Sequence, residues 1–598
     1  MPNNKLKPDN IEIHNKTVAD FGHLDYIHKF FENLSSAQDN AISPNLMFDT
    51  FLDFNKNAAD SYQGILANPE KAYTSATNAF NSYMDLINYT VNKSTNPSND
   101  LEPVVKPAKG DKRFRHESWD NQPYFDYLKQ SYLIFSQFIN TSIDQLDGIT
   151  PDQKRKIKFY AKTITDTMSP SNFPMTNPEV LTKAVETNGE SLIEGMQNFL
   201  RDTNSSTGEL SIKNCNMNAF QVGKNIAYTP GKVVYQNDLM QLIQYEPSTP
   251  SVYKTPMLII PAWINKYYIF DLQSHNSFIK WAVDNGHTVY IISWINPGIE
   301  HRNKCFEDYI KFGPMAAMEF IKKSIGEPKV NAIGYCLGGI ILTSLMGMLG
   351  KDAKKHFNTA SLFATLIDFS KAGDLLLFSH GNQASNFQSQ IDKLGYLDSK
   401  TMSLAFNSLK ANEMIWSAFV NNYLLGNEAP SFDILYWNAD ATNLPAKMYD
   451  FYIQAFFKNN KLIKPHALTL MNKEVNIKAI DVPSFVLGTI EDHIAPWQSS
   501  YPAMQLFSGD RKFVLGGSGH VAGVINPADS NKYGFWSNSD INTDPSAWLE
   551  NATHHSGSWW NEWHDWIKNY TDKMVNADER KVIDLPFEDA PGSYIRMK

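Results

Sequence analysis

The spacing of apolar residues divides the chain into two parts. Before about residue 220, apolar residues recur at mixed intervals of three and four, for example over 124–135 and 191–199, which predicts amphipathic helices. The first 110 residues are polar and rich in Asn. We therefore expect a polar N-terminal extension over 1–110 and an α-rich N-terminal domain over 111–230.

The pattern changes near residue 232, where short apolar runs begin to alternate with helical stretches. The first two runs, 233–235 and 240–245, predict a leading hairpin. Six later runs predict buried strands at 256–261, 287–294, 330–334, 360–367, 482–487 and 512–515. Strands that alternate with helices form a mostly parallel sheet, so we expect an α/β domain over 231–598.

One interval in this domain is unusually long. Roughly 115 residues separate the fourth and fifth predicted strands, far more than a crossover between neighbouring strands needs. Part of this interval, 402–425, has a helical period. We predict a cap insertion at about 375–470 that covers the C-terminal edge of the sheet.

Composition narrows the class of protein. With 598 residues, 42% apolar and 20% charged, the chain suits a soluble globular protein of two or three folding units. The net charge of -9 and the lack of a long basic run argue against nucleic acid as a partner. No apolar stretch reaches the length of a transmembrane segment. The three cysteines form no C-x-x-C pair, which argues against a disulfide framework or structural zinc and fits a reducing cytoplasm.

The stretch 330–342 carries the candidate nucleophile. An apolar run meets Cys336, which Gly334 and Gly338 flank in a G-x-C-x-G pattern, and a helical period follows. A sharp strand-to-helix turn of this kind exposes a nucleophile above the sheet edge, and the helix N-terminus below it favours a thiolate. Serine is commoner at this position, so Cys336 would be a thiol variant. The alternative is a buried cysteine at a tight helix–strand contact.

The acid and the base of a catalytic triad are expected after the nucleophile, in that order, at strand ends of an α/β-hydrolase sheet. Asp492 follows the fifth predicted strand, and His520 lies in a glycine-rich loop after the sixth. Spacing alone would also allow Glu491 or His493. We interpret these as a solvated carboxylate and a structural histidine.

Acyl transfer also needs donors for the negative charge that develops on the carbonyl oxygen. The backbone N–H of Leu337, directly after the nucleophile, is the first candidate. The second comes from the loop after the 256–261 strand, around Trp263 and Ile264. The alternative interpretation of this loop is aromatic packing against the cap.

At this point the sequence resembles a known family, the class I polyhydroxyalkanoate synthases. The resemblance rests on motifs at 264–268, 334–339, 491–497, 518–527 and 557–560, and weaker similarity covers most of the chain apart from its Asn-rich start. It implies that Cys336, Asp492 and His520 are nucleophile, acid and base. The implied reaction moves (R)-3-hydroxyacyl groups from coenzyme A to a growing polyester and releases coenzyme A, and we expect short groups such as 3-hydroxybutyryl. One departure is Phe306, where the family usually has Trp.

The resemblance further implies a homodimer, together with polymer granules and their coat proteins as partners. We expect no cofactor. Because coenzyme A carries phosphates, a cation near the entrance is expected, and Lys410 in the predicted cap is a candidate. A solvated lysine on an amphipathic helix explains Lys410 equally well.

Several questions remain open from the residues alone. His520 would take the proton of Cys336, whereas either His520 or Asp492 could activate the incoming hydroxyl. A cysteine-dependent thioesterase and a catalytically silent granule-surface or scaffold protein are alternatives on the same fold. The histidines at 554, 555 and 564 have no common metal-site spacing and lie among tryptophans, so no metal is expected.

Overall fold

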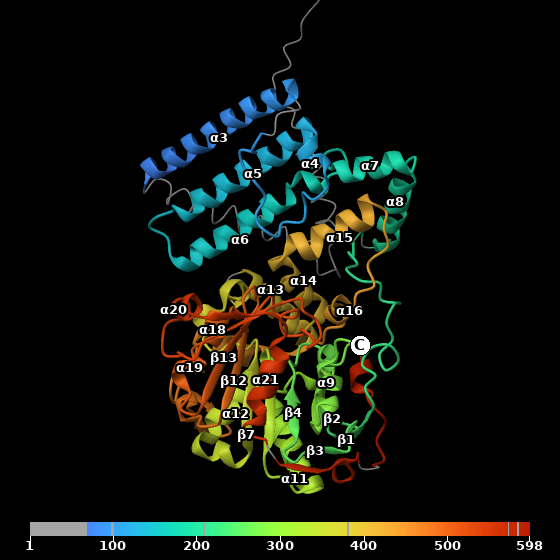
Figure 1. Cartoon of the computed structure of the whole chain (residues 1–598), viewed down its shortest axis with the longest axis vertical. Coiled ribbons are helices and arrows are strands. Elements are labelled where there is room, and N and C mark those ends of the chain that lie inside the picture. The colour runs from blue at the N-terminus through green and yellow to red at the C-terminus, as the bar shows by residue number, and fades with distance from the viewer. Residues whose placement is uncertain are drawn as a thin grey trace, which may run out of the picture.

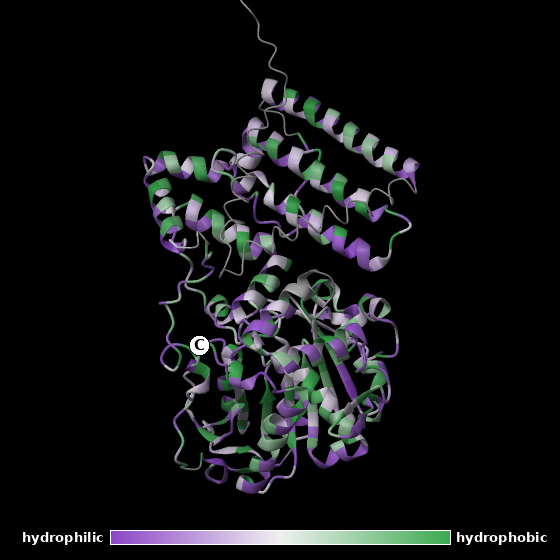
Figure 2. Cartoon of the chain, turned by 180° about the vertical axis from the view of Figure 1, so that it is seen from behind, coloured by the Kyte–Doolittle hydropathy of each residue, from purple (hydrophilic) through white to green (hydrophobic). Residues whose placement is uncertain are grey.

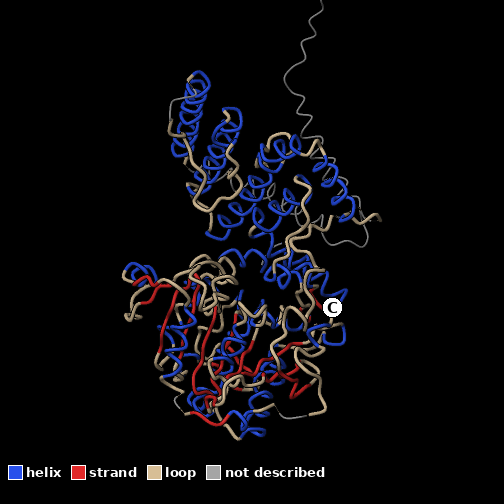
Figure 3. The backbone as a smooth tube through the Cα atoms, turned by 45° about the vertical axis from the view of Figure 1, so that its right-hand side comes forward, coloured by secondary structure: helices blue, strands red, loops and turns tan. Residues whose placement is uncertain are grey.

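The computed structural model describes residues 68–96 and 101–598, apart from 207, 209, 380, 381, 572, 583 and 584. Most of the predicted Asn-rich extension, 1–67 and 97–100, lies outside the described residues. Helices gather at one end of the molecule and strands at the other (Figures 1 and 3). The N-terminal helices are α3 (Pro69–Thr95), α4 (Ser118–Asn121), α5 (Pro123–Asp144), α6 (Pro151–Thr167), α7 (Pro178–Glu186) and α8 (Glu190–Asp202).

Ten strands form the central sheet, in the order β1-β2-β5-β4-β6-β7-β12-β13-β14-β15. The six strands from β5 to β13 run parallel, and an antiparallel pair flanks them at each end. The strands are β1 (Gly231–Gln236), β2 (Met240–Tyr245), β4 (Met257–Ile260), β5 (Val289–Trp294), β6 (Val330–Tyr335), β7 (Phe357–Phe363), β12 (Ser484–Thr489), β13 (Arg511–Gly516), β14 (Phe535–Ser537) and β15 (Thr553–His555).

These strands confirm the predicted hairpin and the mostly parallel sheet, with two differences. The predicted strand 360–367 begins and ends earlier, because Phe357 pairs with Val330 and the backbone leaves extended geometry at Ala364, where φ is 47°. The edge strands β14 and β15 were not predicted. They have three residues each, which is too short for a clear period.

The sheet buries both faces, and Figure 2 shows apolar residues gathered on its strands. Successive strand residues point to opposite faces. Accordingly, Leu258 and Ala332 belong to a core with α12 (Leu337–Leu349), whereas Ile259 and Ile333 belong to a second core. The second core includes α9 (Phe278–Asp284) and α21 (Trp559–Lys568). The remaining helices around the sheet are α10 (Phe306–Ile310), α11 (Ala316–Ile325), α18 (Trp497–Ser500), α19 (Ala503–Leu506) and α20 (Pro545–Glu550).

The long interval between β7 and β12 forms the predicted cap insertion. The expected helix over 402–425 is interrupted: it comprises α14 (Ser399–Leu409), α15 (Ser417–Phe419) and the π-helical segments η8 (Asn412–Trp416) and η9 (Val420–Leu424). A third π-helical segment, η10 (Tyr452–Lys458), lies further along the cap. The other cap helices are α13 (Asn382–Leu394), α16 (Asp433–Ala439) and α17 (Ala446–Phe451).

The N-terminal helices contact this cap, as Figure 1 shows for α8 and α15. Asn198 on α8 donates a hydrogen bond to the carbonyl oxygen of Asn422 (3.1 Å), and the Tyr423 hydroxyl donates to Asp202 (3.1 Å). A Cβ on Gly195 would lie 2.2 Å from the carbonyl oxygen of Tyr423, so the two backbones are in direct contact. No helix among the described residues is long and apolar enough to cross a membrane.

Candidate active site

Cys336 lies on the sharp turn between β6 and α12. Its backbone is in an unusual conformation for a residue with a side chain, with φ 52° and ψ -118°. The Cys336 N–H donates to the carbonyl oxygen of Phe363 (2.9 Å), and the Cys336 carbonyl accepts from the N–H of Gly339 (3.1 Å). These two bonds hold the strained turn from either side.

The glycines beside Cys336 allow close packing of backbones. A Cβ on Gly338 would lie 1.9 Å from the carbonyl oxygen of Ile260, and one on Gly334 would lie 2.5 Å from the Cα of Gly339. Neither glycine has a positive φ, so lack of side-chain volume is what the turn requires. The close approach brings the loop after β4 against the start of α12.

Asp492 lies just after β12, in the loop that follows the strand. One of its carboxylate oxygens is 2.7 Å from Nδ1 of His520. The other accepts hydrogen bonds from the backbone N–H groups of Ile494 (2.9 Å) and Ala495 (2.8 Å). Burial alone would raise the pKa of Asp492, but His520 and these N–H groups hold that pKa below its usual range.

His520 lies between this carboxylate and the thiol. Burial would lower the pKa of His520, but Asp492 and the hydrogen-bonded Cys336 outweigh burial and raise that pKa well above its usual value. The structure therefore brings Cys336, His520 and Asp492 together in that order. In this arrangement the imidazole of His520 can accept the thiol proton, and the carboxylate of Asp492 can orient the imidazole.

The two alternative residues occupy different positions. Glu491 is exposed. His493 is partly buried, and burial followed by the charge of Lys410 lowers its pKa to about 4. His493 is thus neutral near pH 7, and it is His520 that holds the carboxylate of Asp492.

The predicted oxyanion residues adjoin the thiol. Ile264, Leu337 and Cys336 line one cavity. The carbonyl oxygen of Trp263 accepts from the Thr442 hydroxyl (3.0 Å), and because a trans peptide points its C=O and N–H in opposite directions, the Ile264 N–H faces away from Thr442. The Trp263 ring also packs on Phe306, as the alternative interpretation of this loop expected.

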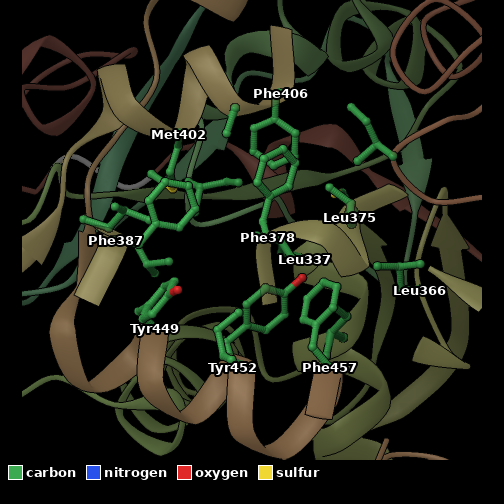
Figure 4. Close-up of a pocket in the computed structure, with 18 of the residues that line it drawn as sticks. Leu337, Leu366, Leu375, Phe378, Phe387, Met402, Phe406, Tyr449, Tyr452 and Phe457 are labelled. Atoms are coloured by element: carbon green, nitrogen blue, oxygen red, sulfur yellow. The ribbon is translucent and has the colours of Figure 1, made fainter. Parts of the chain in front are cut away.

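A cavity of about 100 Å³ extends from the thiol beneath the cap (Figure 4). Its lining is almost wholly apolar, and Figure 4 shows cap side chains gathered around it. They include Phe378, Phe387, Met402, Phe406, Tyr449, Tyr452 and Phe457. An apolar enclosure of this kind excludes water from a group that is bound at the thiol.

Tyr452 was not among the predicted site residues. Burial, followed by Cys336, raises the pKa of its phenol well above the ordinary value, so the phenol stays neutral near the sulfur. Tyr452 belongs to no motif. The only signal was the apolar spacing of 449, 452, 453, 456 and 457, which by itself indicates packing.

Lys410 is the C-cap residue of α14 and is partly buried. It forms no ion pair with any carboxylate of the described residues, although it lies near enough to His493 to affect the pKa of that histidine.

The three C-terminal histidines have separate environments: His564 is 3.3 Å from His287, His555 bonds Ser537 at 2.9 Å, and His554 packs on Trp536. In the described part of the chain, no three His, Cys, Asp or Glu side chains are grouped to hold a metal ion.

The parallel sheet, the turn at Cys336 and the chain order of the three residues define an α/β-hydrolase fold, and residues 255–527 match the alpha/beta hydrolase fold family. Residues 110–282 match the family described as poly-beta-hydroxybutyrate polymerase (PhaC) N-terminus.

Three similar proteins bear related names. A poly(3-hydroxyalkanoate) polymerase subunit PhaC from Rhizobium etli is 42% identical over 82% of this chain and 78% of its own. A poly(3-hydroxyalkanoate) polymerase from Methylorubrum extorquens is 40% identical over 89% and 88%, and the PhaC subunit from Cupriavidus necator is 34% identical over 82% and 83%. The chain belongs to the poly(3-hydroxyalkanoate) polymerase family, whose members are acyltransferases.

Proposed function

We propose that this chain polymerises (R)-3-hydroxyacyl groups from coenzyme A into polyester, through an acyl thioester on Cys336. The observation that carries the proposal is the Cys336–His520–Asp492 arrangement at the end of a water-excluding apolar cavity. Exchange of one thioester for another is nearly isoenergetic, so the acyl group stays activated for an alcohol. Exclusion of water favours the alcohol over hydrolysis.

In the first step, His520 accepts the Cys336 proton while the sulfur attacks the thioester carbonyl. The N–H groups of Leu337 and Ile264 would stabilise the oxyanion, and His520 returns the proton to the departing coenzyme A thiolate. In the second step, the hydroxyl of the next unit attacks the Cys336 thioester and the thiol is restored.

We assign activation of that hydroxyl to His520. Asp492 is wholly buried, with one oxygen on His520 and the other on two backbone N–H groups. These contacts support an orienting role for Asp492. The cavity volume of about 100 Å³ supports a short acyl group such as 3-hydroxybutyryl. The homodimer and the granule partners remain predictions from the family.

The direct test supplies purified protein with (R)-3-hydroxybutyryl-coenzyme A and follows thiol release, turbidity and free acid together. We expect thiol release with insoluble polymer and little free acid. Release with an equal amount of free acid would instead identify a thioesterase, and no release would identify a catalytically silent protein.

Lys410 is proposed to contact a phosphate of coenzyme A, because it is a partly buried cation near the site without a carboxylate partner among the described residues. Lys410→Gln should raise KM for the coenzyme A thioester about tenfold, as expected for loss of one charge-assisted hydrogen bond, and leave kcat nearly unchanged. The exposed Lys400 on the same helix provides the control, Lys400→Gln. Equal KM values in the two variants would contradict the assignment.

A further inference from the structure

The loop that follows β4 carries one of the proposed oxyanion donors, and several distant segments hold it. On the cap side, Thr442 bonds the carbonyl oxygens of Trp263 and Ile264, each at 3.0 Å. The indole N–H of Trp437 donates to the carbonyl oxygen of Lys266 (2.7 Å). All three bonds come from the cap, so they would move with it.

The side chain of Lys266 points to a different part of the molecule. It is buried, with 3% of its surface exposed, and its ammonium donates to the carbonyl oxygens of Ile595 (2.8 Å) and Met597. Burial is the main factor that lowers the pKa of Lys266, and Asp440 partly offsets it. Burying an ammonium group costs free energy unless the group is hydrogen-bonded, and here two carbonyl oxygens accept its hydrogen bonds.

The segment that receives Lys266 is fixed to the sheet. The Tyr594 N–H donates to the side chain of Gln241 on β2 (3.1 Å), and the Tyr594 hydroxyl donates to the carbonyl oxygen of Asn237 (2.7 Å). Ile595 is 1% exposed and belongs to the same core as β2. The hydrogen bonds of the Lys266 ammonium therefore connect the loop after β4 to the body of the domain and not to the cap.

We infer that Lys266, bound to segment 594–597, is a positioning residue that keeps the oxyanion loop in place when the cap moves. The inference rests on the proposed function, because it assigns Lys266 to the same acyl-transfer step. Admission of each new acyl group and exit of polymer require some displacement of the cap that encloses the cavity. The indole N–H of Trp294 on β5 also holds the start of this loop, at the carbonyl oxygen of Pro261 (3.0 Å). Beyond Pro261, a loop held by Thr442 and Trp437 without Lys266 would follow that displacement and withdraw its donor from the thioester.

The test compares Lys266→Met with Lys266→Arg in the thiol-release assay. Loss of one oxyanion donor lowers kcat by about 100-fold or more, so we expect a fall of about that size in Lys266→Met with KM within about twofold. Lys266→Arg keeps a cationic donor and should recover most of the activity. Alkylation of Cys336 by iodoacetamide needs no oxyanion donor and should proceed at the unaltered rate in both variants.

Two outcomes would overturn the inference: unchanged kcat in a folded Lys266→Met, or an equal fall in alkylation and thiol release. If Lys266→Met does not fold, Tyr594→Phe replaces it, since it keeps the ring and removes the hydroxyl that bonds the carbonyl oxygen of Asn237 and contacts Gln236. Tyr594→Phe should lower kcat a few-fold at constant KM, and unchanged kcat would again reject the inference. Cys336→Ala tests the proposed function separately, because thiol release by that variant would refute the acyl thioester on Cys336 that the proposed function requires.

Discussion

Replacing Cys336 by alanine is expected to abolish thiol release from (R)-3-hydroxybutyryl-coenzyme A. No other described side chain combines a place on the strained turn with a hydrogen bond to His520. Without the sulfur, no acyl thioester forms, and neither polymer nor acyl-enzyme should be detected. The measurement is thiol release together with the intact mass of the protein after brief exposure to substrate, which should show an added acyl group only in the unaltered chain.

The other two cysteines provide matched controls. Cys215 is buried and bonds the carbonyl oxygen of Phe432, and Cys305 precedes α10. Neither lines the cavity at Cys336. Cys215→Ala and Cys305→Ala should retain thiol release and the added acyl mass. Retained activity in Cys336→Ala would refute the nucleophile assignment.

Asp492→Asn is expected to lower kcat by about 10⁴-fold, the size of effect known when an orienting carboxylate of a Ser-His-Asp triad becomes an amide. The amide presents an N–H to His520 and favours the wrong imidazole tautomer. Because Asp492 acts on His520 in this account, the first acylation of Cys336 and the later transfer to hydroxyl should slow together. Rapid-quench measurement of the first thiol released separates these two steps.

A different result would reassign Asp492. If the first acylation stayed fast while polymer growth stopped, Asp492 would be the group that activates the hydroxyl, and His520 would serve the thiol alone. Asp433→Asn is the control, since Asp433 is also buried and accepts two side-chain hydrogen bonds of 2.9 Å, from Gln273 and Asn276. It should keep kcat within a few-fold of the unaltered value.

The fold could be predicted from the sequence where the spacing of apolar residues matches the burial of the element that they form. Strands β4, β5, β6, β12 and β13 each contain a short apolar run, and the shortness of these runs distinguishes the strands from helices. The turn at Cys336 and the loops of Asp492 and His520 could be placed because the parallel strands that precede them end at one edge of the sheet.

The features of the site and the cap that could not be predicted depend on contacts between segments far apart in the sequence. No local pattern indicates that Tyr452 faces the sulfur, that Thr442 holds Trp263, or that Lys266 reaches residues 595–597. The helical period over 402–425 was visible, but the π-helical segments were not, since the apolar spacing tolerates one extra residue per turn. Such features follow from tertiary packing rather than from propensity.

The contact between α8 and the cap has a consequence for selectivity. Because Gly195 brings the backbone of α8 against Tyr423, part of the cap is covered by a helix whose contact residues are more than 200 positions away in the sequence. If the N-terminal helices packed less tightly on the cap, the cap would therefore enclose the cavity at Cys336 less tightly. Under the proposed function, water would then compete with the hydroxyl for the thioester. The ratio of free acid to polymer would therefore measure how tightly the N-terminal helices pack on the cap, although neither of the two contacting segments contains a residue of the triad.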